Sequence, residues 1–552
     1  MIETFTAQSG ALTARVDGIA LHSPYDPARE ARRFAEANLG PETPSAVVVL
    51  GEGLGYVSAA VESLYPGVRL IRIFYSDEIM EIGLPRSAGP AAPGVSGLAW
   101  CPGMETGIGA FLAGVLGELD LEGLRLIEWP PSARLFPAVS RRANESVRQL
   151  VQELNGSFAT TLAAGRLWIR NAISNFLAID STLVGELCPV DRPVLLAAAG
   201  PSLEDAAPLI AEVRSRIDLW ALPSSSLLLR DKGLAPDLLV MTDPGFYSLH
   251  HMRYSAPLCP LAMPLSAARG AWDLPWAKTR ESIAAPFLLA QPGFLEKSLL
   301  EEAGVQAPLI APHGTVAATA LDLALASTRA PVIVAGLDMC TRDICLHARP
   351  NAFDQLLLLQ SSRLTPHYSL SFQRAAAQRV EQIPGVKGVR ASPSLKTYAG
   401  WFNEPRTDFP ARTYRLLPSR IALEGMRPLD AGSLKEMLAG SPEMPRGTRL
   451  HRSDDFPRRD ERHTIVSRIL NGWTAELVRA HSTAVSQGML DLLGRSPSLL
   501  SLAYHIEPQR LIEARRKSRQ RDSSGALRTA KEMLERCMDF LREISEKTGA
   551  AA

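Results

Sequence analysis

The chain has 552 residues, far more than the roughly 150 of one ordinary domain, so about three or four domains are expected. Its 59 basic and 58 acidic residues create no overall field that favours nucleic acid or an anionic membrane, and neither is a predicted partner. The six cysteines show no C-x-x-C spacing, so neither a disulfide framework nor a zinc site is predicted. Without a signal-peptide pattern or an apolar run of the roughly 18 residues that a membrane span needs, a soluble cytoplasmic protein is expected.

The first α/β pattern lies near the amino terminus, in "SAVVVLGEGLGYVSAAV". A buried strand over 46–50 is followed by three alternate glycines and a helix, which is half of a nucleotide-binding unit. It resembles the first motif of S-adenosylmethionine-dependent methyltransferases. The acid expected after the next strand is missing, however, because Tyr75 and Ser76 stand there. We therefore expect the glycines only to permit close packing, without binding of the methyl donor.

From about residue 141 a long helical segment is expected to bridge two domains, and strands then alternate with helices. The predicted strands are "PVLLAAAG", "DLWALPSS", "PDLLVMTD" and "PVIVAGLD". This alternation predicts a doubly wound parallel sheet of the Rossmann-like α/β class. Beyond about residue 410 the composition favours helices. The predicted organisation is a smaller α/β domain over 1–140, a central domain over 141–410 and a helical domain over 411–552.

Small and polar residues follow the predicted strands and open the predicted helices. In a parallel sheet these positions meet at the carboxyl edge, where turn amides and helix amino termini bind ligands. Each residue alone could be an ordinary helix cap, but together they predict a nucleotide site. The predicted ligand-binding residues are Ala199, Gly200, Pro201, Ser202, Ser224, Ser225, Asp243, Gly314, Thr315 and Gly336.

These same segments carry a family resemblance. The stretches "AAAGPSLEDAAPLI", "KGLAPDLLVMTD" and "HGTVAATALDLALASTRAPVIVAGLDMCTRDICLHA" are similar to the central domain of the Maf family of flagellin glycosyltransferases. The same domain family includes MptE-like 6-hydroxymethylpterin pyrophosphokinases, and bacterial sialyltransferases are more distantly similar. "GLGY" and "LWIRNAISNF" also look like flanking segments of Maf proteins. One departure is Ala198, which stands where the related turn usually opens with glycine.

The resemblance implies transfer of a nonulosonic acid, of the pseudaminic or legionaminic type, from a CMP-activated donor to flagellin serine or threonine. It implies His347, in "CLHARP", as the first candidate for acid–base catalysis, with His367 as the alternative. Asp338 is the third predicted catalytic residue, and it or Asp243 could orient ribose or bind metal. No D-x-D triplet is present, so no metal ligands are assigned and a divalent-metal requirement is left open.

Two other functions are compatible with these residues. A pyrophosphokinase would use ATP and Mg²⁺ and would need only the central domain. A flagellin-binding protein without turnover could retain the nucleotide fold, as the departure at Ala198 would allow. A preference for ATP would indicate the pyrophosphokinase, whereas a preference for cytidine nucleotides would indicate the glycosyltransferase.

Overall fold

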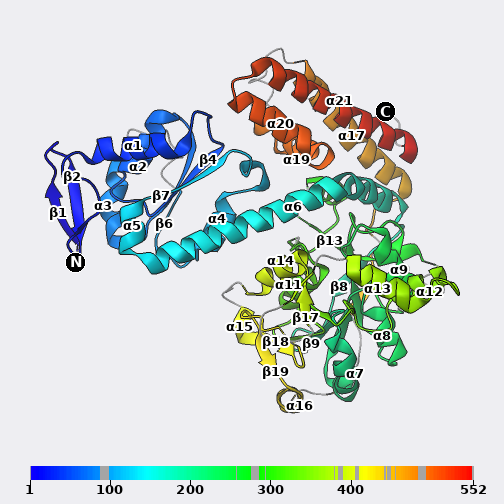
Figure 1. Ribbon diagram of the computed structural model, residues 1–552. Coiled ribbons are helices and arrows are strands. Elements are labelled where there is room, and N and C mark those ends of the chain that lie inside the picture. The colour runs from blue at the N-terminus through cyan, green and yellow to red at the C-terminus, as the bar shows by residue number, and fades with distance from the viewer. Residues whose placement is uncertain are drawn as a thin grey trace. The chain divides into compact units, whose positions relative to one another are not determined.

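The computed structural model (Figure 1) describes residues 2–87, 98–256, 258–274, 285–291, 294–311, 313–377, 380–382, 389–403, 409–419, 421–440, 443, 449–453, 455–482 and 493–549. The chain forms two compact units. The first unit comprises residues 1–162 and 477–537, and the second comprises 163–476 and 538–552. None of the helices within the described residues is long and apolar enough to cross a membrane.

The first unit contains a parallel four-stranded sheet in the order β6-β5-β4-β7. Its central strand β4, Ala46–Leu50, is buried at every position, as expected of a strand covered on both faces. The elements up to the long helix are β1 (Ile2–Thr6), β2 (Leu12–Val16), β3 (Ile19–Ala20), α1 (Pro27–Leu39), α2 (Tyr56–Leu64), β5 (Arg69–Ile73), α3 (Asp77–Ser87), β6 (Ala99–Trp100), α4 (Ile108–Val115), β7 (Leu124–Glu128), α5 (Pro130–Leu135) and α6 (Pro137–Ala178). The carboxyl-terminal helices are α19 (Pro497–Ile506), α20 (Pro508–Arg519) and α21 (Ser523–Thr548).

The second unit is built on a ten-stranded sheet in the order β19-β18-β14-β9-β10-β11-β12-β13-β8-β20. All its pairings are parallel except that of β20 with β8. The strands are β8 (Leu183–Glu186), β9 (Val194–Ala197), β10 (Asp218–Ala221), β11 (Leu238–Val240), β12 (Leu261–Pro264), β13 (Phe287–Leu289), β14 (Val332–Ala335), β18 (Thr413–Leu416), β19 (Arg427–Leu429) and β20 (Arg449–Arg452). A small antiparallel sheet contains β15 (Thr341–Arg342), β16 (Glu381–Gln382) and β17 (Val389–Ala391).

Helices cover both faces of the large sheet (Figure 1). Alternate residues of β9 enter opposite cores: Leu195 faces the core that contains α7, and Leu196 faces the core that contains α11. This doubly wound arrangement confirms the predicted fold class. The helices of the unit are α7 (Ser202–Val213), α8 (Ser226–Asp231), α9 (Phe246–Ser255), α10 (Phe294–Glu302), α11 (Val316–Ser327), α12 (Ala352–Gln360), α13 (His367–Ala377), α14 (Pro393–Asn403), α15 (Phe409–Arg412), α16 (Ala431–Ala439) and α17 (Arg459–His481).

The helical part of the chain begins later than the predicted boundary at 411. Strands β18 and β19 extend the large sheet beyond β14, and β20 pairs with β8 at its other edge. These strands have three or four residues each and lie among prolines and charged residues, so their local pattern resembles loops. From Arg459 onward the described secondary structure is helical.

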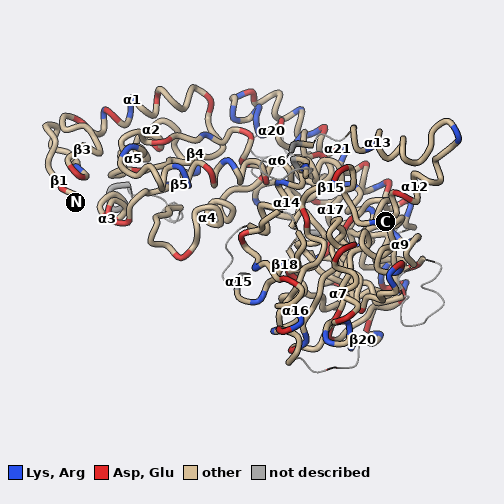
Figure 2. The backbone as a smooth tube through the Cα atoms, turned by 60° about the horizontal axis from the view of Figure 1, so that its bottom comes forward, with Lys and Arg blue, Asp and Glu red and all other residues tan. Residues whose placement is uncertain are grey.

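Basic and acidic residues are interspersed along the described backbone of both units (Figure 2). Positive and negative charges are therefore mixed within each unit, as they are in the sequence as a whole. Selection of a ligand must then depend on small groups of side chains.

Candidate functional site

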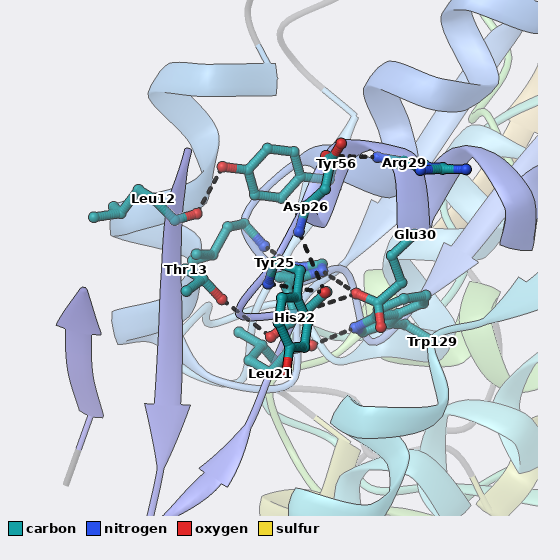
Figure 3. Close-up of polar contacts among 12 residues, drawn as sticks. Leu12, Thr13, Leu21, His22, Tyr25, Asp26, Arg29, Glu30, Tyr56 and Trp129 are labelled. Carbon is teal, nitrogen blue, oxygen red and sulfur yellow. Dashed lines mark hydrogen bonds and ion pairs between the residues drawn. The ribbon is translucent and has the colours of Figure 1, made fainter. Parts of the chain in front are cut away.

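The amino-terminal glycine turn is filled by His22 of the same chain. Figure 3 shows this histidine beside Trp129. His22 Nε2 accepts a hydrogen bond of 3.0 Å from Leu54 N, and the ring stacks on Trp129 with centroids 5.0 Å apart. Burial lowers the pKa of His22 to about 3, so the ring stays neutral and can accept this bond. A Cβ on Gly53 would overlap the imidazole. The glycine therefore makes room for His22, as the packing interpretation of this turn requires.

The second glycine turn joins the ends of two neighbouring strands, β9 and β14. Gly200 N donates to Gly336 O over 2.7 Å. A Cβ on Gly200 would lie 2.5 Å from both Gly336 O and Asp338 Oδ2. Gly336 has φ +72°, and its own Cβ would lie 2.6 Å from Ala198 O. The two glycines therefore allow the backbones and the Asp338 carboxylate to meet at the carboxyl edge of the sheet.

Asp338 acts as an acceptor at the amino terminus of α7. Its Oδ2 accepts a 2.7 Å hydrogen bond from Ser202 N, and its side chain is buried. Burial raises the pKa of Asp338, while the bond from Ser202 and the charge of Arg342 oppose that rise. Sequence reasoning missed Arg415, a buried β18 residue whose charge also interacts with Asp338. The geometry gives Asp338 a capping contact, and its predicted catalytic role stays a prediction.

The serines after β10 differ in what they can offer a ligand. Ser225 is fully buried, and its hydroxyl donates to Ala197 O over 2.7 Å. Ser226 is also buried and donates to Pro223 O over 2.6 Å. Ser224 is half-buried and makes no hydrogen bond within the described residues. Of the two predicted serines, Ser224 and Ser225, only the former has a hydroxyl available to a ligand.

A second group of predicted residues surrounds Tyr398 of α14. The side chain of Asp243 is exposed, and its Oδ1 accepts from Gly245 N over 2.7 Å. Burial, and then the charge of Asp243, raise the pKa of Tyr398. The Tyr398 ring would lie 3.9 Å from a Cβ on Gly314, which has φ +71° and precedes Thr315, the N-cap residue of α11. The structure thus brings Asp243 and the α11 amino terminus together through a tyrosine that sequence reasoning missed.

His347 is attached to the Gly200 turn through its neighbours. Ala348 N donates to Ala199 O over 2.8 Å, and Arg349 N donates to Glu204 Oε1 over 2.9 Å. His347 is half-buried, and burial followed by the charge of Arg374 lowers its pKa to about 4. The ring is therefore neutral near pH 7 and can accept a proton, although weakly.

Two aromatic rings from separate helices lie beside His347. Its centroid lies 5.4 Å from that of Phe353 on α12 and 6.1 Å from that of His251 on α9. His251 is buried, and its pKa is lowered to about 3 by burial and then by His347, His250 and Arg374. Sequence reasoning missed His251 and Phe353, because no local motif joins α9 to α12.

A cavity of about 130 Å³ opens beside His347. His367 begins α13 but does not line this cavity, whereas Ser371 and Arg374 of the same helix do. The structure therefore places His347 beside the cavity and His367 outside it. The remaining lining residues are Ile344, Cys345, Leu346, Arg349, Asn351, Phe353, Asp354, Leu357 and Ala375.

The motif "LWIRNAISNF" in α6 holds the loops that follow β11 and β12. Asn171 Nδ2 donates to Pro244 O and Ser266 O, each over 3.1 Å. Asn175 Nδ2 donates to Leu265 O over 2.8 Å and Ala267 O over 3.0 Å. The asparagines therefore position one side of the carboxyl edge rather than face a ligand.

No group of three or more His, Cys, Asp or Glu side chains in the described part of the chain is arranged to hold a metal ion. The predicted residues that remain placed for ligand contact are Ser224, Asp243 and the α11 amino terminus. The amides of Gly200 and Ser202 already donate to Gly336 O and Asp338 Oδ2, and Pro201 has no N–H group.

Comparisons with known proteins agree with this architecture. Residues 170–343 match the family model described as 6-hydroxymethylpterin diphosphokinase MptE-like. An uncharacterized protein of Treponema pallidum (strain Nichols) is 25% identical over 294 residues, covering 53% of this chain and 60% of that protein. A second uncharacterized protein of that organism is 27% identical over 271 residues, covering 47% of this chain and 45% of that protein. The chain thus spans less than two thirds of either relative.

The solved structure of a Maf glycosyltransferase from Magnetospirillum magneticum AMB-1 superposes with a TM-score of 0.60 at 13% sequence identity. The match covers 99% of this chain and 92% of that one. The chain therefore shares its fold with this Maf glycosyltransferase, and its residues 170–343 are similar to the MptE-like family model.

Proposed function

We propose that the protein is a glycosyltransferase that moves a nonulosonic acid from a CMP-activated donor to a serine or threonine hydroxyl of flagellin. The observation that carries this proposal is the hydrogen bond from Ala348 N to Ala199 O, which fixes His347 beside the Gly200 turn. A nucleotide-binding turn and a neutral histidine are thereby held together at one sheet edge. The fold shared with a Maf glycosyltransferase supports the same function.

In the proposed reaction, the bond between the sugar anomeric carbon and the CMP phosphate oxygen breaks, and CMP leaves with the electron pair. The acceptor hydroxyl oxygen forms the new glycosidic bond, and its proton moves to His347. Amides at the α11 amino terminus stabilise the negative charge of the phosphate, because Gly200 N and Ser202 N already donate to Gly336 O and Asp338 Oδ2. A histidine with a lowered pKa suits the role of proton acceptor, because it is neutral before the reaction.

Calorimetric titration with CMP, CDP, ATP and GTP tests the nucleotide assignment. We expect selective binding of the cytidine nucleotides. A preference for ATP with Mg²⁺ would support a pyrophosphokinase instead, the activity favoured by the match of residues 170–343 to the MptE-like model. Binding of CMP without any modification of flagellin would point to a non-catalytic flagellin-binding protein.

The role of histidine is tested by measuring flagellin modification in variants. His347→Ala should lower turnover by roughly 10² to 10⁴ with CMP affinity nearly unchanged, because it removes an acid–base group. Ser202→Ala and Thr315→Ala should instead weaken CMP binding by about 1 kcal/mol each if their hydroxyls contact the nucleotide. If His347→Ala keeps full turnover and His367→Ala loses it, the role passes to His367.

A further inference from the structure

The small cavity beside His347 has an unbalanced charge. Arg349 Nε lies 3.1 Å from Asp354 Oδ2, so these two lining charges neutralise each other. Asn351 Nδ2 also donates to Asp354 Oδ2 over 3.1 Å. Arg374 instead lies over the Phe353 ring, 4.0 Å from its centroid, and pairs with no carboxylate in the described part of the chain. The lining therefore keeps one positive charge.

Hydrogen-bonding groups in and behind the cavity also lack partners. Ser371 Oγ is buried without a hydrogen bond within the described residues, one turn before Arg374 on α13. His251 Nδ1 is likewise buried without a partner among those residues, behind the His347 and Phe353 rings. Buried polar groups usually have partners, so these groups indicate that a polar ligand belongs here.

The size of the cavity limits what that ligand can be. A volume of about 130 Å³ is well below the roughly 300–1,000 Å³ of pockets that enclose drug-sized molecules. It can hold a carboxylate or a phosphate group but not a nucleoside. A fixed guanidinium with a hydroxyl beside it is well suited to a planar or tetrahedral oxyanion.

We propose that the cavity formed by His347, Ser371 and Arg374 binds one oxyanion, a carboxylate or a phosphate group, of the sugar donor. That the oxyanion comes from the donor rests on the proposed function, whereas the affinity for an oxyanion rests on the cavity itself. α9, α12 and α13, which lie side by side, hold the site together (Figure 1).

Binding of an anion changes the electrostatics of His347. The groups facing it are His251 with its neighbour His250 from α9, Asp354 with its partner Arg349, and Arg374 from α13. Arg374 is the one of these whose charge lowers the histidine pKa. A bound oxyanion offsets that charge, so His347 becomes a stronger base when the donor is in place.

The test follows the His347 resonance by NMR in the full chain labelled with ¹³C at histidine, with and without inorganic phosphate at constant ionic strength. His347→Gln assigns the signal. Phosphate should raise the pKa of His347 by about one or more, as a nearby opposite charge does. In Arg374→Gln the pKa of His347 should already be higher than in the unaltered protein when phosphate is absent. Adding phosphate should then change it little. Arg374→Lys, which keeps the charge, should retain part of the response.

Arg363→Gln is the matched control, because Arg363 is an exposed arginine between α12 and α13 that does not line the cavity. It should respond like the unaltered protein. No response of His347 to phosphate or acetate, or an equal response in Arg374→Gln, overturns the proposal. A response to acetate alone assigns the site to a carboxylate, and a response to phosphate alone assigns it to a phosphate group. If phosphate acts but CMP does not bind the protein, the anion site stands while the proposed function fails.

Discussion

At the scale of single residues, contacts across the sheet decide between structural and ligand-binding roles. Gly200 follows a strand, as in a nucleotide-binding turn, and it also makes room for Asp338 of the neighbouring strand end. Asp338 in turn accepts from Ser202 N at the start of α7. Both features fix the shape of the turn at the sheet edge, and they occupy the N–H groups of Gly200 and Ser202. The structural and functional interpretations therefore depend on the same contacts.

Gly200→Ala should destabilise the second unit by about 1–3 kcal/mol, the usual range for overpacking, because the new methyl group would meet Gly336 O and the Asp338 carboxylate. The matched control is Gly440→Ala, since Gly440 has φ −83° and open space at its Cβ position. Urea unfolding of the three proteins measures the difference. Equal midpoints for Gly200→Ala and Gly440→Ala would show that the turn can relax around the methyl group.

A buried ion pair at the opposite edge of the sheet makes stability depend on pH. Asp218 Oδ1 lies 3.1 Å from Arg192 Nε, and both side chains are buried. Burial, and then the charge of Asp237, raise the pKa of Asp218 from 3.8 to about 6. The folded state thus binds this proton more tightly than the unfolded state. The contribution of Asp218 to folding stability therefore falls as the pH rises from about 4 to about 6, and it is constant above that range.

Asp218→Asn removes this titration, so the stability of the variant should not fall between pH 4 and pH 6 as that of the unaltered protein does. The stability advantage of the unaltered protein should be larger at pH 4.5 than at pH 7, by about 1–2 kcal/mol. Urea unfolding at both pH values gives this difference. Glu186→Gln, which breaks the exposed pair with Arg449, serves as the control and should show little such dependence. If the stability advantage of the unaltered protein over Asp218→Asn were larger at pH 7 than at pH 4.5, the assigned direction of the Asp218 pKa shift would be wrong.

At the scale of elements, α6 takes part in the site without lining it. Its two buried asparagines donate to four carbonyl oxygens in the loops after β11 and β12. Asn175 Oδ1 also accepts from Gly270 N over 3.2 Å. The stretch that resembles a Maf flank therefore has a direct structural role, because it satisfies loop backbone groups that lie away from water.

Asn175→Ala should cost about 2–6 kcal/mol, because it leaves two buried carbonyl oxygens without a donor, at about 1–3 kcal/mol each. Gln149→Ala on the exposed face of the same helix should change stability by less than about 0.5 kcal/mol. Hydrogen exchange of the 265–270 loop, followed by mass spectrometry, should show faster exchange in Asn175→Ala only. Unchanged exchange there would mean that other contacts hold the loop.

The sequence predicted the strands and helices that have a strong local pattern. Buried runs such as β9, β10, β11 and β14 could be identified, and parallel alternation placed their carboxyl ends at one edge. The strands after 410 could not be identified, because they contain prolines and charged residues instead of a buried apolar run, and because β18 and β20 pair with strands distant in sequence. The grouping of His251, Phe353 and Arg374 around His347 depends on how α9, α12 and α13 pack, which has no local sequence signal.

At the scale of the whole molecule, both compact units are assembled from separate stretches of sequence. The second unit needs residues far beyond 410, because β18 pairs with β14 over Val332–Val334 and β19 pairs with β18. Leu416 and Leu429 of these strands belong to the core that also contains Leu195 of β9. A fragment chosen from local composition would therefore cut through one hydrophobic core.

Two fragments test this organisation. Residues 163–476 contain all ten strands of the large sheet, whereas residues 141–410 lack β18, β19 and β20. The shorter fragment would expose the edge of β14 with its apolar face, and unpaired apolar edges promote association between chains. We expect 141–410 to aggregate or to unfold without a cooperative transition, and 163–476 to give a soluble species with a single transition. Size-exclusion chromatography and urea unfolding measure both properties. If 141–410 were as soluble and as cooperative as 163–476, the edge strands would be dispensable, and the core of the second unit would have to close without Leu416 and Leu429.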